Sequence, residues 1–167
     1  GGILGALLAA AALSAWVSHP SVNFVVTAPG SSGAVAAFAA ELTMTFMLMT
    51  VILYVSNHPR LHNLTGVCAG LLVALYITVE APISGMSMNP ARTFASAVPA
   101  WHWTDLWIYF TAPVIGMLAA AELYVRMKGS AQIGCAKLHH DNRQRCIFCG
   151  KPRQKSFSEN LQEEVAA

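Results

Sequence analysis

The residues with the clearest chemical use lie in mid-chain, at Asn89-Pro90-Ala91-Arg92. An Asn followed by Pro is typical of a helix start, because Asn can cap the first turn and Pro can occupy the first helical position. The motif follows an apolar run, and Pro99 soon ends the helix that it would begin. A short helix that starts in apolar surroundings directs unpaired N–H groups into the bilayer, which is tolerated where the backbone lines a water-filled path. The motif therefore predicts a re-entrant half-helix beside a pore.

Two side chains of this motif could act on a passing solute. The Asn89 carboxamide can donate an N–H to water, and simple capping of the helix is the alternative. Arg92 is the one Lys or Arg between Arg60 and Arg126. A charge inside a membrane costs ~2.5–3.5 kcal/mol on insertion scales and usually marks a functional position. For Arg92 the alternative is snorkelling to the headgroups.

A second cluster near the C-terminus carries metal-ligand chemistry. Its members are Cys135, His139, Cys146 and Cys149. Thiolate and imidazole donors suit a tetrahedral structural Zn²⁺, and His140 competes for the imidazole position. Unligated thiols in an unstructured tail are an equal alternative.

The composition is that of a membrane protein. Of 167 residues 55% are hydrophobic and 11% are charged, and the mean hydropathy is +0.50, which is too apolar for an ordinary soluble domain. Apart from Arg60 and Arg92, every Lys and Arg lies between Arg126 and Lys155. We therefore expect a membrane domain at 1–127 and a polar tail at 128–167, with the zinc-knuckle candidate at 135–149.

The apolar segments predict an all-α membrane protein. A span needs about 20 residues, and the candidates are 1–17, which is short and reads as a truncated span, 33–55, 64–83 and 104–127. Glu41 interrupts the second candidate, and Glu80 lies near the end of the third. The expected fold is four transmembrane helices, the first one truncated, plus a re-entrant loop and half-helix at about 84–99.

The distribution of charge predicts the orientation. Residues 18–32 contain no Lys, Arg, Asp or Glu, whereas 56–63 carries Arg60 with two His residues, and the tail is basic. By the positive-inside rule the 56–63 loop and the tail are cytoplasmic, and 18–32 lies outside. We expect an integral protein of the plasma (inner) membrane.

The Asn89 motif resembles the second signature loop of the aquaporin, or major intrinsic protein (MIP), family. Three neighbouring segments are similar to that family's fourth, fifth and sixth spans in order and length; these are 40–46, 70–75 and 107–116. The stretch 82–88 is similar to the nodulin-like subgroup of plants and its bacterial relatives. The resemblance covers residues 1–127 and implies the second half of an aquaporin-like right-handed bundle.

The resemblance assigns roles within the site. In the family this loop meets a mirror-related copy near the midplane, and the two helix N-termini repel protons and cations. Arg92 would then form the selectivity constriction, and Glu41 would accept hydrogen bonds from loop amides. Ile77 stands where water channels usually carry His, and Met86 where they carry a small residue or Cys. Thr93 stands where glycerol channels usually carry Asp.

These features predict a passive transmembrane channel for water and other small neutral solutes, which needs no cofactor for transport and is not an enzyme. A family member has six spans and two signature loops, so we expect the chain to be an incomplete C-terminal half that begins in the third span. The full-length protein would be a homotetramer in a lipid bilayer, without a nucleic-acid partner. The alternative is a membrane-anchored interaction or metal-sensing module that acts through the Cys/His tail.

If the tail binds Zn²⁺, the segment at about 133–151 should take up one metal ion and gain order, because binding energy in small sites is folding energy. Its affinity should fall as the pH drops, since thiolates must be deprotonated to bind. Competition with Co²⁺, followed by absorbance and thiol accessibility, measures this. Thiols that gain no protection from added metal would indicate an unligated tail.

Overall fold

The structure is a computed structural model that describes residues 1–58 and 60–129. All regular elements within these ranges are helical. In chain order they are α1 (Gly2–Ala12), α2 (Ser14–Val17), the 3-10 turn η1 (Asn23–Val25), α3 (Gly33–Ser56), the 3-10 turn η2 (His62–Leu64), α4 (Thr65–Ser84), α5 (Pro90–Ala100) and α6 (Leu106–Lys128). The expected all-α membrane fold is confirmed, since α3, η2 with α4, and α6 are each long and apolar enough to cross a bilayer.

The N-terminal apolar segment forms two short helices instead of one continuous helix. Leu13, at φ −123° and ψ 27°, separates α1 from α2. Nothing in the apolar composition around Leu13 marks this break, because neither Gly nor Pro stands there.

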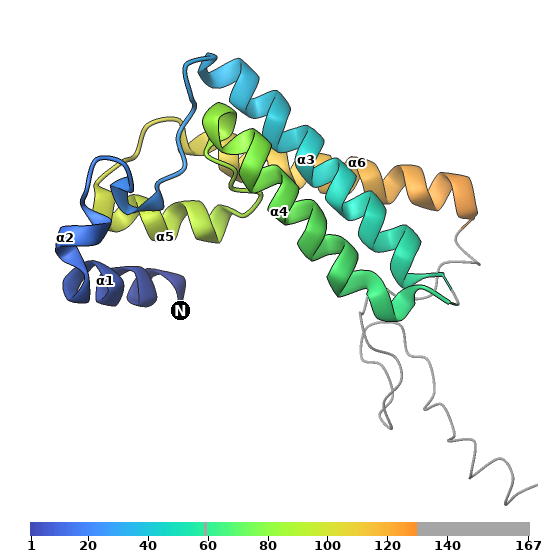
Figure 1. Cartoon of the computed structure of the whole chain (residues 1–167). Helices are drawn as coiled ribbons and strands as arrows, with labels where there is room; N and C mark the ends of the chain where they lie inside the picture. The colour runs from blue at the N-terminus through green and yellow to red at the C-terminus, as the bar shows by residue number, and fades with distance from the viewer. Residues whose placement is uncertain (59, 130–167) are drawn as a thin grey trace, which may run out of the picture.

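Helices α3 and α6 run parallel and pack closely along their length (Figure 1). Phe38 stacks on Trp107 near the start of both helices, and Tyr54 meets Tyr124 edge-on near their ends. Gly116 permits the approach, because a Cβ there would lie 2.3 Å from Thr45 Oγ1 and 2.4 Å from the Leu42 carbonyl oxygen. Small residues at such crossings allow close packing of helices in lipid.

Helix α5 is half the length of a span and lies beside α1 (Figure 1). Its 11 residues rise about 16 Å, against the roughly 30 Å of a bilayer core. Trp101 ends the helix with a left-handed backbone at φ 53°. The chain thus turns at the end of α4, runs beside α1 as α5, and then returns to begin α6 (Figure 1).

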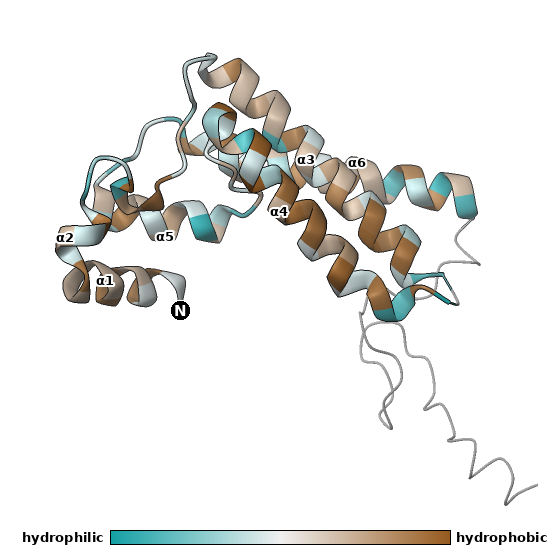
Figure 2. Cartoon of the chain, viewed as in Figure 1, coloured by the Kyte–Doolittle hydropathy of each residue, from teal (hydrophilic) through white to brown (hydrophobic). Residues whose placement is uncertain are grey.

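Two small buried clusters hold the bundle together. One joins α3 and α4 to the loop before α5, and its members are Met44, Tyr76, Met86 and Met88. The other joins α3 to α6 through Ala37, Ile108 and Tyr109. The outer faces of the long helices are strongly apolar, and polar residues gather at the helix ends and on α5 (Figure 2), as a lipid-facing surface requires.

The contact at Gly116 gives a stability prediction. Gly116→Ala should lower the free energy of unfolding by about 1–3 kcal/mol, because its Cβ overpacks the α3–α6 contact. Thermal or SDS unfolding of the purified protein in detergent measures this. Gly70→Ala is the matched control, since a Cβ at Gly70 on α4 meets nothing within 4 Å. Equal effects of the two substitutions would contradict the role of Gly116.

Candidate functional site

The site is built around the start of α5. Asn89 is the N-cap, with an extended backbone, and its Oδ1 accepts from the amides of Ala91 (2.9 Å) and Arg92 (3.3 Å). Pro90 occupies the first helical position, where a missing N–H costs nothing. Helix capping, the plainer interpretation of this Asn, is therefore present. It uses only Oδ1, and the exposed Asn89 retains its Nδ2 group as a donor.

The loop that precedes α5 has an unusual backbone. Gly85, Met86 and Met88 all have positive φ, at 74°, 47° and 53°. This conformation is strained for residues with a side chain. It also prevents continuation of α4, so the amides of 86–88 need partners other than helix carbonyls.

Glu41 of α3 is fully buried and supplies the partners of two of these amides, those of Ser87 and Met88. Its Oε1 accepts from the amide of Ser87 at 2.7 Å and from the hydroxyl of Ser84 at 2.9 Å, and its Oε2 accepts from the amide of Met88 at 2.7 Å. Three donors satisfy a carboxylate that would otherwise be costly in an apolar bundle. The structure thus brings Glu41 against the loop that follows α4.

Two further hydrogen bonds support the loop, and the sequence did not single out their residues for this role. The Ser84 hydroxyl accepts from the Met86 amide at 3.1 Å. The Tyr109 hydroxyl of α6 donates to the Ser84 carbonyl at 2.6 Å. The signal that could have found Ser84 and Ser87 is their polarity within an apolar run, close to Asn89.

Arg92 lies in the first turn of α5 and is partly buried. Its Nη1 is enclosed and has no hydrogen-bond partner among the described residues. The guanidinium thus has at least one N–H group that no described residue accepts. The roles in conduction expected for Asn89, Pro90, Ala91 and Arg92 remain predictions.

The two positions expected to tune a constriction lie in different surroundings. Ile77 is 55% exposed on α4. Met86 is only 5% exposed, because its side chain packs with Met44, Tyr76 and Met88. The structure therefore does not bring Ile77 and Met86 together in one buried cluster, and their effect on solute choice stays a prediction.

The candidate metal ligands Cys135, His139, Cys146 and Cys149 lie outside the described residues. Within residues 1–58 and 60–129, no group of three or more His, Cys, Asp and Glu side chains could hold a metal ion.

The Glu41 contacts predict a local effect of substitution. Glu41→Gln should lower stability by about 1–3 kcal/mol, since the carboxamide replaces one acceptor oxygen by a donor that faces amide N–H groups. It should also speed hydrogen exchange of the Ser87 and Met88 amides. Exchange mass spectrometry and thermal unfolding measure both effects. Glu122→Gln is the control, because Glu122 is exposed and pairs with Arg126 one turn away; equal effects would count against this role for Glu41.

Comparison with known proteins agrees with these features. Residues 1–124 match the family described as Major intrinsic protein. The chain is 42% identical over 120 residues to "Probable aquaporin NIP7-1" of Arabidopsis thaliana, which covers 70% of this chain and 43% of that protein. It is 38% identical over 128 residues to "Aquaporin NIP3-1" of Oryza sativa subsp. japonica (75% and 41%), and 40% identical over 125 residues to "Aquaporin NIP2-2" of Zea mays (74% and 42%).

The chain thus spans less than half of the length of these curated relatives. The family match nevertheless extends from α1 to Tyr124 of α6 and includes both Glu41 and the loop that it holds. On these grounds, the chain belongs to the major intrinsic protein, or aquaporin, family.

Proposed function

We propose that this chain forms the half of a passive transmembrane channel that contains α5, and that the channel conducts water and other small neutral solutes. The observation that carries the proposal is a helix that begins at Asn89-Pro90 within a bundle of membrane-length helices. Its start is preceded by a loop whose amides bind a buried carboxylate instead of lipid or water. Irregular backbone at membrane depth is found where it lines an aqueous path or is buried in protein.

Asn89 and Arg92 would provide the polar lining of this path. Asn89 keeps a free carboxamide donor at the positive end of α5, and the partly buried Arg92 carries a guanidinium one turn later. Donors and a fixed positive field favour water and hydroxylated solutes and disfavour cations. The names of the relatives, which are all aquaporins, support this assignment.

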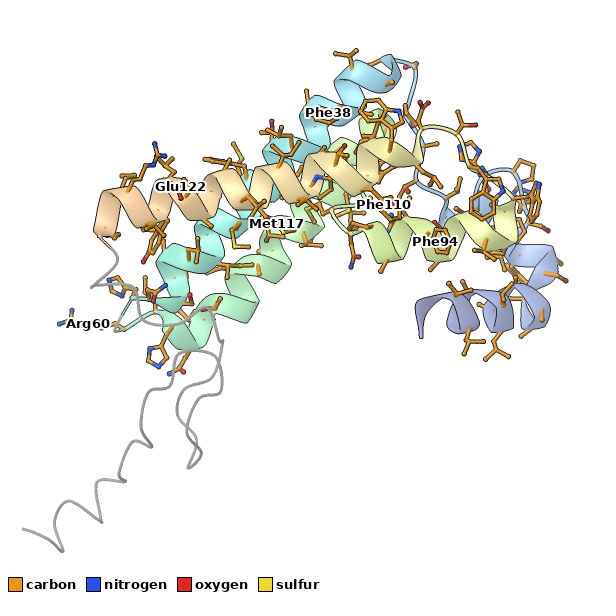
Figure 3. The ribbon with its side chains drawn as sticks, turned by 180° about the vertical axis from the view of Figure 1, so that it is seen from behind. Phe38, Arg60, Phe94, Phe110, Met117 and Glu122 are labelled. Atoms are coloured by element: carbon orange, nitrogen blue, oxygen red, sulfur yellow. The ribbon has the colours of Figure 1, made fainter. Side chains whose placement is uncertain are left out.

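We also propose that the protein lies in the plasma membrane, and that the end of the bundle with the α3–α4 connection faces the cytoplasm. Arg60 lies on this connection and points away from the helices (Figure 3). Lys128, at the end of α6, lies over the Tyr54 ring near the end of α3, at 5.5 Å from the ring centroid. Basic residues from the α3–α4 connection and from the last turn of α6 thus lie at one end, as the positive-inside rule expects of a cytoplasmic face. The homotetramer remains a prediction from the family resemblance.

Water flux tests the proposed function. The protein expressed from its complete gene and reconstituted in vesicles should raise osmotic water permeability without raising proton or ion leakage, as measured by stopped-flow light scattering. Shrinkage at the rate of empty vesicles, with good incorporation, would contradict a channel and favour the membrane-anchored alternative.

In the same assay Arg92→Ala should raise leakage of small cations at least roughly tenfold, because a fixed charge in a site of low dielectric contributes well over 1.4 kcal/mol to their exclusion. Arg126→Ala is the control, since Arg126 is exposed and pairs with Glu122 on the same helix.

A further inference from the structure

A chain of buried hydroxyl groups joins the connection between α2 and α3 to the first turn of α5. Thr27 Oγ1 lies 2.7 Å from Thr93 Oγ1, which also hydrogen-bonds Ser87 Oγ. Thr27 and Thr93 are fully buried, and Ser87 is nearly so. Because Thr27 and Thr93 are 66 residues apart in sequence, this is a tertiary contact and not local helix capping.

The direction of the protons follows from the last member of the chain. Ser87 Oγ lies 2.9 Å from the carbonyl oxygen of Asn89, which can only accept, so Ser87 donates its proton there. Thr93 must then donate to Ser87, and Thr27 must donate to Thr93. Every hydroxyl donates once in the same direction. The Asn89 carbonyl at the end of the chain also accepts from the amide of Thr93 at 3.1 Å, which is the first helical bond of α5.

The segment that carries Thr27 also contacts the end of α4. The Gly30 amide donates to the Ile83 carbonyl at 2.9 Å, and a Cβ at Gly30 would lie 1.9 Å from the Pro82 carbonyl oxygen. A Cβ at Gly85 would lie 2.9 Å from Thr27 Cα. Residues 27–30 are therefore packed against both ends of the loop between α4 and α5.

The position of Arg92 depends on this packing. The enclosed Nη1 of Arg92 has no partner in the described part of the chain, so no hydrogen bond from a described neighbour orients the guanidinium through that atom. The backbone at the start of α5 and the atoms that enclose Nη1 therefore place the guanidinium. Thr93, the next residue, is the one that Thr27 holds.

We propose that residues 27–30 are a positioning element for solute selectivity. Thr27 acts through Thr93 and Ser87 to fix the backbone of Asn89 and Arg92. Thr27 need not touch the solute, and none of its hydrogen bonds is used in building α3 or α6. The transport consequence rests on the proposed channel function, whereas the effect on the loop does not.

Three variants of the protein in lipid nanodiscs test the effect on the loop. Thr27→Val removes the hydroxyl and keeps the shape, and Thr27→Ser keeps the hydroxyl. Thr78→Val is the matched control, because Thr78 is exposed and its hydroxyl donates to the Ala74 carbonyl within α4. Thr27→Val should raise hydrogen exchange in peptides that cover residues 87–93 roughly three- to tenfold, the change expected from one lost neutral hydrogen bond. Thr27→Ser and Thr78→Val should match the wild type there.

The second measurement is the ratio of glycerol to water permeability in vesicles. Thr27→Val should change this ratio several-fold while water flux remains, and Thr27→Ser should restore the wild-type ratio. A change in folded content alone would scale both permeabilities equally and leave the ratio as it was.

The outcomes separate this proposal from the proposed function. Unchanged exchange in Thr27→Val would overturn the positioning role, and raised exchange with an unchanged permeability ratio would overturn its effect on selectivity. A wild-type protein without water flux would overturn the channel function alone, since the exchange measurement requires no flux. If Thr27→Val does not fold, Thr27→Ala removes the same hydroxyl without adding bulk and faces the same criteria.

Discussion

The structure depends on the hydrogen bonds between one buried carboxylate of α3 and the backbone amides of the loop before α5. A carboxylate inside an apolar bundle is costly, and so are backbone amides that no helix or sheet uses. Glu41 and the amides of Ser87 and Met88 remove both costs with bonds of 2.7 Å. The left-handed conformations at Met86 and Met88 can persist because these contacts hold them. The pairing thus supports the loop from which α5 begins.

The pairing requires that α3 be fixed, and α6 fixes it. Gly116 lets the two backbones approach at Leu42, the residue after Glu41, and at Thr45, one turn after it. From the same helix Tyr109 donates to the Ser84 carbonyl at the end of α4. The α3–α6 interface therefore serves both helix packing and loop support. We expect a substitution that widens this interface to displace the loop and the start of α5. The sequence does not indicate that the loop depends on α6, because the residues involved are far apart along the chain.

Features with a local cause could be predicted from the sequence. The helix start at Asn89-Pro90 follows from capping chemistry, and the membrane fold follows from apolar length. Glu41 is the one acidic residue in an apolar span, and burial of its carboxylate requires hydrogen-bond donors nearby. The contact between Thr27 and Thr93 could not be predicted, because nothing in either neighbourhood specifies a partner 66 residues away. Positive φ at Met86 was equally hidden, since it arises from tertiary hydrogen bonds and not from the residue type.

Because α5 is too short to cross a bilayer, it adds nothing to the count of membrane crossings. The parallel arrangement of α3 and α6 is the visible result: α4 returns the chain to the end where α3 began, and the loop with α5 leaves it there. An ordinary span at 90–100 would have reversed α6 and everything after it. The brevity of one helix thus decides at which side of the bilayer α6 ends.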